Sequence, residues 1–171
     1  MLRHTKRFSL AAHFAALFAI LIIPTSGAQA PARTHAMIEW SADLSGAKDS
    51  SLGARALTVL TPATGKVTAS FDFDHKTVTF QGQAKNIVGI SKIELRATRS
   101  TGDLSGPVLA TLFDAHDGPF NGTIAKTITG QAFEPVANAI TNGQAAVVVT
   151  TDAHPDGEIA GFLQMFKQYH H

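Results

Sequence analysis

The sequence predicts an all-β fold, an antiparallel β-sandwich with one short helix, preceded by an N-terminal export signal. From Met37 onward, apolar and polar residues alternate with a period close to two, which is typical of strands that are buried on one face. Polar segments containing Gly, Asn or Asp separate the alternating runs, as turns do. Within this part of the chain, only residues 133–140 have apolar residues at helical spacing.

The first 28 residues have the three-part layout of a secretory signal peptide. Three basic residues precede a nearly continuous apolar run over residues 8–23, and small residues follow it. We expect cleavage after Ala28, with later cuts after Ala30 or Ala36 as alternatives. An uncleaved anchor is less favoured, because the run is shorter than the roughly 20 residues that a membrane span needs.

The clearest strand pair is predicted at residues 66–73 and 77–84, which alternate on either side of the polar turn at residues 74–76. Their inward positions are Val67, Ala69, Phe71 and Phe73 on the first strand, and Val78 and Phe80 on the second. These two runs predict a β-hairpin.

The remaining elements follow at turn-separated intervals. Further strands are predicted at residues 90–97, 108–113, 121–129, 145–151 and 158–166. The Gly- and Ser-rich residues 100–107 are predicted to form a loop. The apolar residues Phe133, Val136, Ala137 and Ile140 predict a short helix that ends near Gly143.

Length and charge set the domain organisation and exclude one class of partner. The chain has 171 residues, which suits a leader (1–28), a short tail (29–36), one domain (37–167) and a C-terminal tail (168–171). Of the 14 Lys and Arg residues three lie in the leader, and all 13 Asp and Glu residues follow it, so the mature net charge is −2. A weakly acidic domain with dispersed charges is not expected to bind nucleic acid.

The chain contains no cysteine, which excludes disulfide bonds, thiol nucleophiles and thiolate metal sites together. Exported small domains often rely on disulfides. This domain must therefore be held together by packing and strand pairing.

Four segments resemble those of the chordin-type (CHRD) domain family. They are the opening strand at residues 40–46, the Gly-containing lead at 61–65, the Gly-Pro-Val strand at 106–113 and the closing motif at 147–163. The closing motif matches in Pro155, Gly157, Glu158, Ile159 and Gly161. Of these we take Pro155, Gly157, Glu158 and Gly161 as structural residues of the family. The resemblance implies a β-sandwich related in shape to the immunoglobulin-like and copper–zinc superoxide dismutase sandwiches, and it implies no catalytic activity.

The chain departs from the family pattern where the family commonly carries histidines. At the two positions of the family's His-x-His pair, this chain has Glu94 and Arg96. At the position of the histidine in the family's His-Thr pair, it has Thr150. Three such imidazoles on one sheet face would suit a transition metal. We expect Glu94 and Arg96 instead to form a surface ion pair worth about 0–1 kcal/mol.

No arrangement of residues predicts a catalytic site or a cofactor, so the leading hypothesis is a non-enzymatic module that acts in the periplasm or outside the cell. Its expected partner is a protein or another component of the cell envelope, and no stable membrane insertion is expected after signal cleavage. Interaction candidates are Lys92, Glu94 and Arg96, which are predicted to face outward on one strand. The alternative is an extracytoplasmic copper- or zinc-binding protein that uses His116, His154, Asp114, Asp117 and Asp152.

Overall fold

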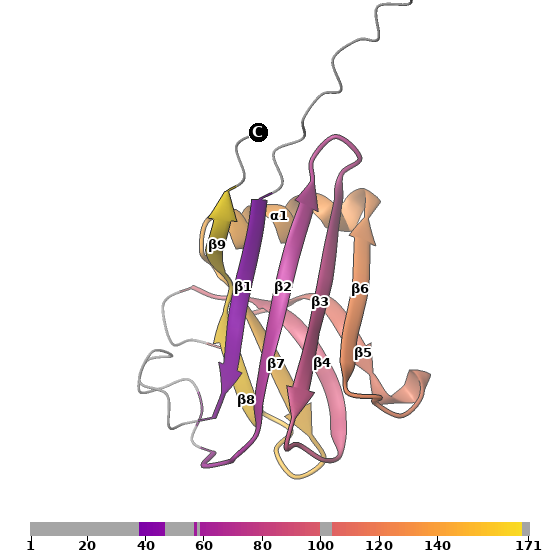
Figure 1. Ribbon diagram of the computed structural model, residues 1–171, viewed down its shortest axis with the longest axis vertical. Helices are drawn as coiled ribbons and strands as arrows, with labels where there is room; N and C mark the ends of the chain where they lie inside the picture. Colours follow the sequence, from indigo (N-terminus) through magenta and orange to yellow (C-terminus); the bar gives the residue numbers. More distant parts are fainter. Residues whose placement is uncertain (1–37, 47–56, 58, 100–103, 169–171) are drawn as a thin grey trace, which may run out of the picture. The chain divides into compact units, whose positions relative to one another are not determined.

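Figure 1 shows a computed structural model of the chain, which describes residues 38–46, 57, 59–99 and 104–168. The chain divides into residues 1–33 and a compact unit at 34–171, and the described residues all belong to the second. The predicted leader, the tail at 29–36 and residues 169–171 lie outside the described residues. No helix in the described part of the chain is long and apolar enough to cross a membrane.

Within the described residues, the domain consists of nine strands, one α-helix and two 3₁₀ turns. The strands are β1 (Ile38–Ser45), β2 (Thr64–Asp72), β3 (Thr77–Lys85), β4 (Ile90–Ala97), β5 (Val108–Asp114), β6 (Thr123–Thr129), β7 (Ala145–Thr151), β8 (Ile159–Phe162) and β9 (Gln164–Gln168). The helix is α1 (Phe133–Thr141), and the 3₁₀ turns are η2 (Ala115–Asp117) and η3 (Gly130–Ala132).

The strands form one antiparallel sheet in the order β5-β4-β7-β8-β1-β2-β3-β6, with β9 beside β1. The sheet curls so that β1, β2, β3 and β6 form a front layer, and β4, β5, β7 and β8 lie behind them (Figure 1). Among the described residues β5 and β6 are not paired with each other, so the barrel-like ladder is nearly closed. The all-β antiparallel class and the short helix are confirmed, whereas the sandwich subtype stays a prediction.

The core lies between the two layers. Its largest fully buried side chains include Phe80, Leu44, Ile93, Leu95, Ile124, Ile140, Ile159 and Leu163. They come from strands of both layers, from α1 and, for Leu163, from the junction between β8 and β9. Burial of these apolar side chains, at about 25 cal/mol per Å², is the main term that stabilises the domain in the absence of disulfides.

The predicted hairpin is β2–β3, which pairs from Thr64↔Lys85 to Asp72↔Thr77. Its inward positions are buried as expected, except that Phe73 is 47% exposed, so the prediction for Phe73 was wrong. The alternation ends with β2, because Phe73 already belongs to the turn. Its ring stacks on Phe71 at 5.3 Å instead of entering the core.

The helix prediction is confirmed. Phe133, Val136, Ala137 and Ile140 are the buried residues of α1, so their spacing does form one apolar stripe. The helix ends where the Gly143 N–H donates to the Ile140 carbonyl at 2.9 Å.

The closing segment is divided rather than forming the single predicted strand at residues 158–166. β8 pairs with β7 and, at Ala160, with β1, whereas β9 pairs with β1, so the chain leaves β7 at Leu163. Between them, the Leu163 N–H donates to the Ala145 carbonyl at 3.0 Å. Periodicity alone did not reveal this change, because the apolar character continues across it.

Candidate functional site

The predicted interaction candidates lie on the outer side of β4. Lys92 pairs in register with Asp114 of β5 on one side and with Thr150 of β7 on the other. Its side chain is exposed, and its Nζ lies 3.8 Å from the Asp114 carboxylate. Lys92 therefore faces solvent, as the alternation of β4 predicts.

Glu94 is not exposed, so the prediction for its exposure was wrong: only 8% of the residue remains accessible. Arg96 donates from Nε at 2.9 Å and from Nη2 at 2.7 Å to the Glu94 Oε2 atom. Arg96 also donates from Nη1 to the Leu104 carbonyl at 3.2 Å, which ties the loop before β5 to this face. The expected surface ion pair is thus a partly buried pair joined by two hydrogen bonds, with a third bond from Arg96 to Leu104.

A second, small apolar cluster explains this burial. It consists of Leu104, Ala146, Val148 and Ala160, with Leu57 and Phe162 packed against it. The alternation of β7 places Ala146 and Val148 on the side opposite the main core, and Glu94 pairs with Val148. Strand β7 is therefore covered on its outer side as well, and Glu94 lies beside that cover.

Thr150 occupies the third position at which the resemblance places a histidine. Its hydroxyl lies 2.9 Å from the Ser91 hydroxyl and 3.3 Å from the Lys92 carbonyl. All three positions are therefore occupied by groups that bond within the fold: Glu94 and Arg96 to each other, and Thr150 to β4. The role of Lys92, Glu94 and Arg96 in interactions stays a prediction.

The residues of the metal-binding alternative lie at the ends of β5 and β7. Asp114 ends β5, and His116 and Asp117 belong to η2 directly after it. Asp152 and His154 belong to the turn after β7. Strands β5 and β7 flank β4 and run in the same direction, so both loops leave the same end of the back layer. No group of three or more His, Asp or Glu side chains able to hold a metal ion occurs among the described residues, and the alternative stays a prediction.

Asp114 caps η2. The His116 backbone N–H donates to its Oδ1 atom at 2.9 Å. This hydrogen bond, followed by the positive charge of Lys92, lowers the pKa of Asp114 below its ordinary value of 3.8. Asp114 is thus an ionised cap at neutral pH.

The residues of the family-like closing motif form the tight connection from β7 to β8. Gly157 has a φ of +130°, a conformation that side-chain-bearing residues rarely adopt, and a Cβ there would lie 2.9 Å from Leu57. A Cβ on Gly161 would lie 2.3 Å from the Asp43 carbonyl, so β8 lies close to β1 only because this position has no side chain. Pro155 is exposed in the turn that joins β7 to β8.

Glu158 is a buried carboxylate with two hydroxyl donors. Thr61 donates to Oε1 at 2.8 Å, and Thr151 donates to Oε2 at 2.9 Å. Thr61 precedes β2 in the front layer, whereas Thr151 ends β7 in the back layer. Glu158 therefore joins the layers, which gives this motif residue a structural role.

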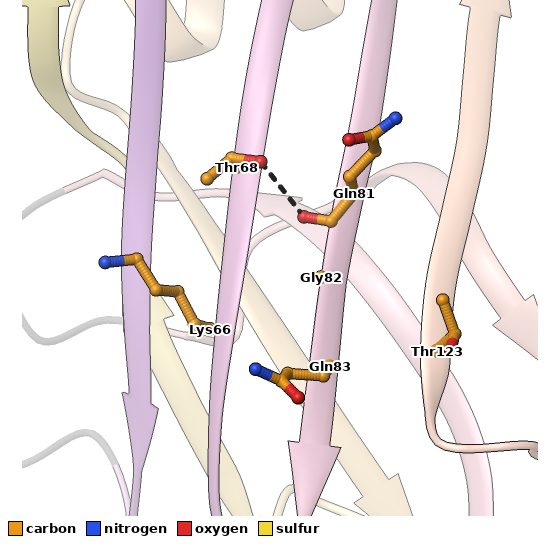
Figure 2. A pocket seen from close by; sticks show the side chains of 6 residues that line it. All are labelled: Lys66, Thr68, Gln81, Gly82, Gln83 and Thr123. Carbon is orange, nitrogen blue, oxygen red and sulfur yellow. Dashed lines mark hydrogen bonds between the residues drawn. The ribbon is translucent and has the colours of Figure 1, made fainter.

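A polar depression that the sequence pattern does not predict lies on the outer side of the front layer. It has a volume of about 410 Å³ and is lined by Lys66, Thr68, Gln81, Gly82, Gln83 and Thr123. Figure 2 shows these residues on β2, β3 and β6, with the Lys66 side chain extending toward β1 and the Gln83 side chain extending toward β2. The available signal was the composition of the outward hairpin positions, which are polar but mostly uncharged.

Comparison with known proteins identifies one domain. The CHRD domain model matches residues 40–163, from β1 to the end of β8 and well over half of the chain. No curated protein matches the sequence.

Proposed function

The chain belongs to the CHRD domain family, and on that premise we propose that it is an exported, non-enzymatic module that binds a protein or another cell-envelope partner in the periplasm or outside the cell. The single observation that carries the non-enzymatic part is the set of contacts at Glu94, Arg96 and Thr150. These positions hold an ion pair and a hydroxyl where the resemblance places imidazoles. Within this proposal, the two layers form a sandwich related to the immunoglobulin-like and superoxide dismutase-like shapes.

The location rests on the signal-peptide pattern of residues 1–28. Fractionation of the native host, followed by N-terminal sequencing, tests it. The proposal expects a mature protein that begins at Gln29, or near it, in the periplasmic or extracellular fraction. A full-length protein confined to the cytoplasm would overturn this part.

The binding role rests on the exposed part of β4 and on the loop before β5. A photo-crosslinking amino acid at Lys92, introduced in the native host, would capture a partner on this face. Lys126 of β6 provides the matched control, because it is an exposed lysine on a strand of the other layer. One product that forms from position 92 and not from position 126 supports the proposal, whereas no specific product from 92 contradicts the assignment of this face.

Copper or zinc binding is the second candidate, since η2 and the turn after β7 leave the same end of the back layer. The test is the metal content of the domain without His170 and His171, after incubation with copper or zinc and desalting. Stoichiometric metal that is lost in His116→Ala or His154→Ala would make metal binding the working function. A metal-free protein would remove this candidate.

A further inference from the structure

The front layer carries an open trough on its outer side. The depression at Lys66, Thr68 and Gln81 adjoins a smaller one of about 180 Å³, which is lined by Thr64, Gly65, Lys66, Gln83 and Lys85. The two depressions share Lys66 and Gln83, so together they follow β2 and β3 along the sheet. We propose that this trough binds an acidic polysaccharide, with Gln81 and Gln83 contacting sugar hydroxyls and with Lys66 and Lys85 contacting sugar carboxylates.

The shape of the trough favours a chain-like ligand. An enclosed cavity suits a compact small molecule, whereas two adjoining depressions along neighbouring strands accommodate consecutive units of a polymer. Gly82 helps to form this surface, since a Cβ at this position would lie 2.3 Å from the Lys66 carbonyl. The missing side chain lets β3 lie close against β2 beneath the trough.

The hydrogen-bonding groups of the trough match sugar hydroxyls. Neither the Gln81 nor the Gln83 side-chain amide bonds to another described residue, so both amides are available to a ligand. Each amide offers two donors and an acceptor, and a sugar hydroxyl can both donate and accept. The two glutamines are two residues apart on one strand, which places them on the same face about 7 Å apart. Figure 2 shows the Thr68 hydroxyl beside them, where it donates to the Gln81 backbone carbonyl at 3.2 Å.

An aromatic ring lies beside Lys66, one of the residues that line the trough. Phe166 of β9 is 53% exposed, and the Lys66 Nζ atom lies 5.3 Å from the centre of its ring. Because Lys66 extends from the outer side of the sheet, the ring lies on that side too. The apolar C–H face of a sugar packs readily on such a ring, so Phe166 extends the proposed site beyond β1.

Charge selects an acidic sugar. Lys66 lines both depressions and Lys85 lines the smaller one, and no carboxylate is among the lining residues of either. The Lys66 Nζ atom does lie 3.8 Å from the Asp43 carboxylate, but both side chains are exposed. Such a pair contributes little, so a ligand carboxylate can replace Asp43 at small cost.

The inference goes beyond the proposed function and concerns a different face. The proposed partner contacts β4 in the back layer, whereas the polysaccharide contacts β2 and β3 in the front layer. A protein can fail one test and pass the other, because crosslinking from position 92 reports only on the back layer. Calorimetry with purified protein and defined oligosaccharides, compared between the parent domain and the trough variants, reports on the proposed trough.

The experiment is titration of the mature domain with hexagalacturonate, an acidic oligosaccharide, and with cellohexaose, a neutral one. We expect saturable binding of hexagalacturonate that weakens as salt increases, and at least tenfold weaker binding of cellohexaose. The Gln81→Ala/Gln83→Ala variant is expected to lose about tenfold or more in affinity, which corresponds to about 1.4 kcal/mol. The Lys66→Ala/Lys85→Ala variant is expected to bind more weakly and to lose most of the salt dependence.

Thr127→Ala and Lys126→Ala are the controls, because they are exposed on β6 of the same layer but do not line the trough. Both are expected to bind like the parent domain, and urea unfolding shows whether each variant remains folded. No binding of hexagalacturonate would overturn the proposal, as would binding that the trough variants leave unchanged. Equal binding of the two oligosaccharides would overturn the assignment to acidic sugars.

Discussion

The two layers of the domain differ on their outer sides. In the front layer, β2 and β3 alternate between buried and accessible residues except at Gly65 and Gly82, which are partly accessible, so one side contacts the core and the other contacts water. In the back layer, all seven residues of β7 are buried. The main core covers one side of β7, and the cluster around Leu104 and Val148 covers the other.

This difference shows how one sheet serves two purposes. A strand that is buried on both sides stabilises the domain but offers few side chains to a ligand. A strand with an exposed polar side can contact a ligand through side chains that contribute little to the stability of the domain. The sequence pattern predicts this difference. Alternation of apolar and polar residues indicates a strand with one solvent-exposed side, whereas a continuous apolar run such as residues 145–149 indicates a strand that is buried on both sides.

Val148→Asp should destabilise the domain most, by more than about 4 kcal/mol, because it places an unpaired charge in the covered outer cluster. Ala125→Asp is the matched change on β6, where the side chain is exposed, and it should cost less than about 1 kcal/mol. Urea unfolding measures both. If Val148→Asp does not fold, Val148→Thr should still lose about 1–3 kcal/mol. Similar losses for the two aspartate variants would contradict the covered outer side.

Glu158→Ala should lower the free energy of unfolding by about 2–4 kcal/mol, since it removes the acceptor of two hydroxyls that belong to different layers. Glu158→Gln should cost less, because the amide oxygen still accepts one of those bonds. Thermal unfolding compares the two variants. Equal losses for both would show that the cost comes from packing and not from the hydroxyl contacts.

Glu94→Ala should cost about 1–3 kcal/mol, because it leaves the partly buried Arg96 without its carboxylate partner. The exposed pair of Lys76 and Glu134 is the control, and Glu134→Ala should cost less than about 0.5 kcal/mol. A double variant, Glu94→Ala/Arg96→Ala, should lose less than the two single changes added together. Chemical denaturation of the four variants measures these differences.

The smallest effects concern pH and have opposite signs in the two layers. A hydrogen bond from the His75 ring to Asp72 at 2.7 Å, together with the Asp72 charge, raises the pKa of His75 above 6.5. Its stabilising contribution is present below pH 6.5 and is lost as pH rises through the raised pKa. The lowered pKa of Asp114 acts in reverse: its contribution is present above pH 3.8 and is lost as pH falls through that lower pKa.

NMR titration of the His75 ring and of the Asp114 carboxyl measures the two pKa values. Comparison of the parent with His75→Gln should show a stability difference at pH 6 that disappears in alkaline solution. A His75 pKa at or below 6.5 would contradict the hydrogen bond to Asp72.

Local pattern predicted most of the elements correctly, including the bounds of β4 and β7 and the buried stripe of α1. The errors occurred where contacts with residues outside the strand itself decide whether a side chain is buried or which strand it pairs with. Glu94 was predicted to be exposed because it alternates outward, but Leu104, ten residues later in the chain, helps to cover that side. The division between β8 and β9 also depends on contacts outside this segment, because β8 pairs with β7 and β1 and β9 pairs with β1.

The trough at Gln81 and Gln83 was missed for a different physical reason. Sequence reasoning looks for charged or reactive groups, whereas a surface that binds through amides and hydroxyls has an ordinary composition. Only pairing of β2, β3 and β6 places these residues side by side. The outward polar positions were predictable, but their grouping around Gly82 was not.

The pairing of β1 with β8 and β9 has a consequence for how the domain assembles. The first strand of the domain obtains its partners on one side from residues 159–168, at the other end of the folded chain. Closing so long a loop costs entropy before any contact repays it, and such distant contacts slow folding. A chain of which only residues up to 150 have folded lacks these partners of β1. The sheet is completed only when residues 159–168 have joined it, so these two strands determine when folding ends.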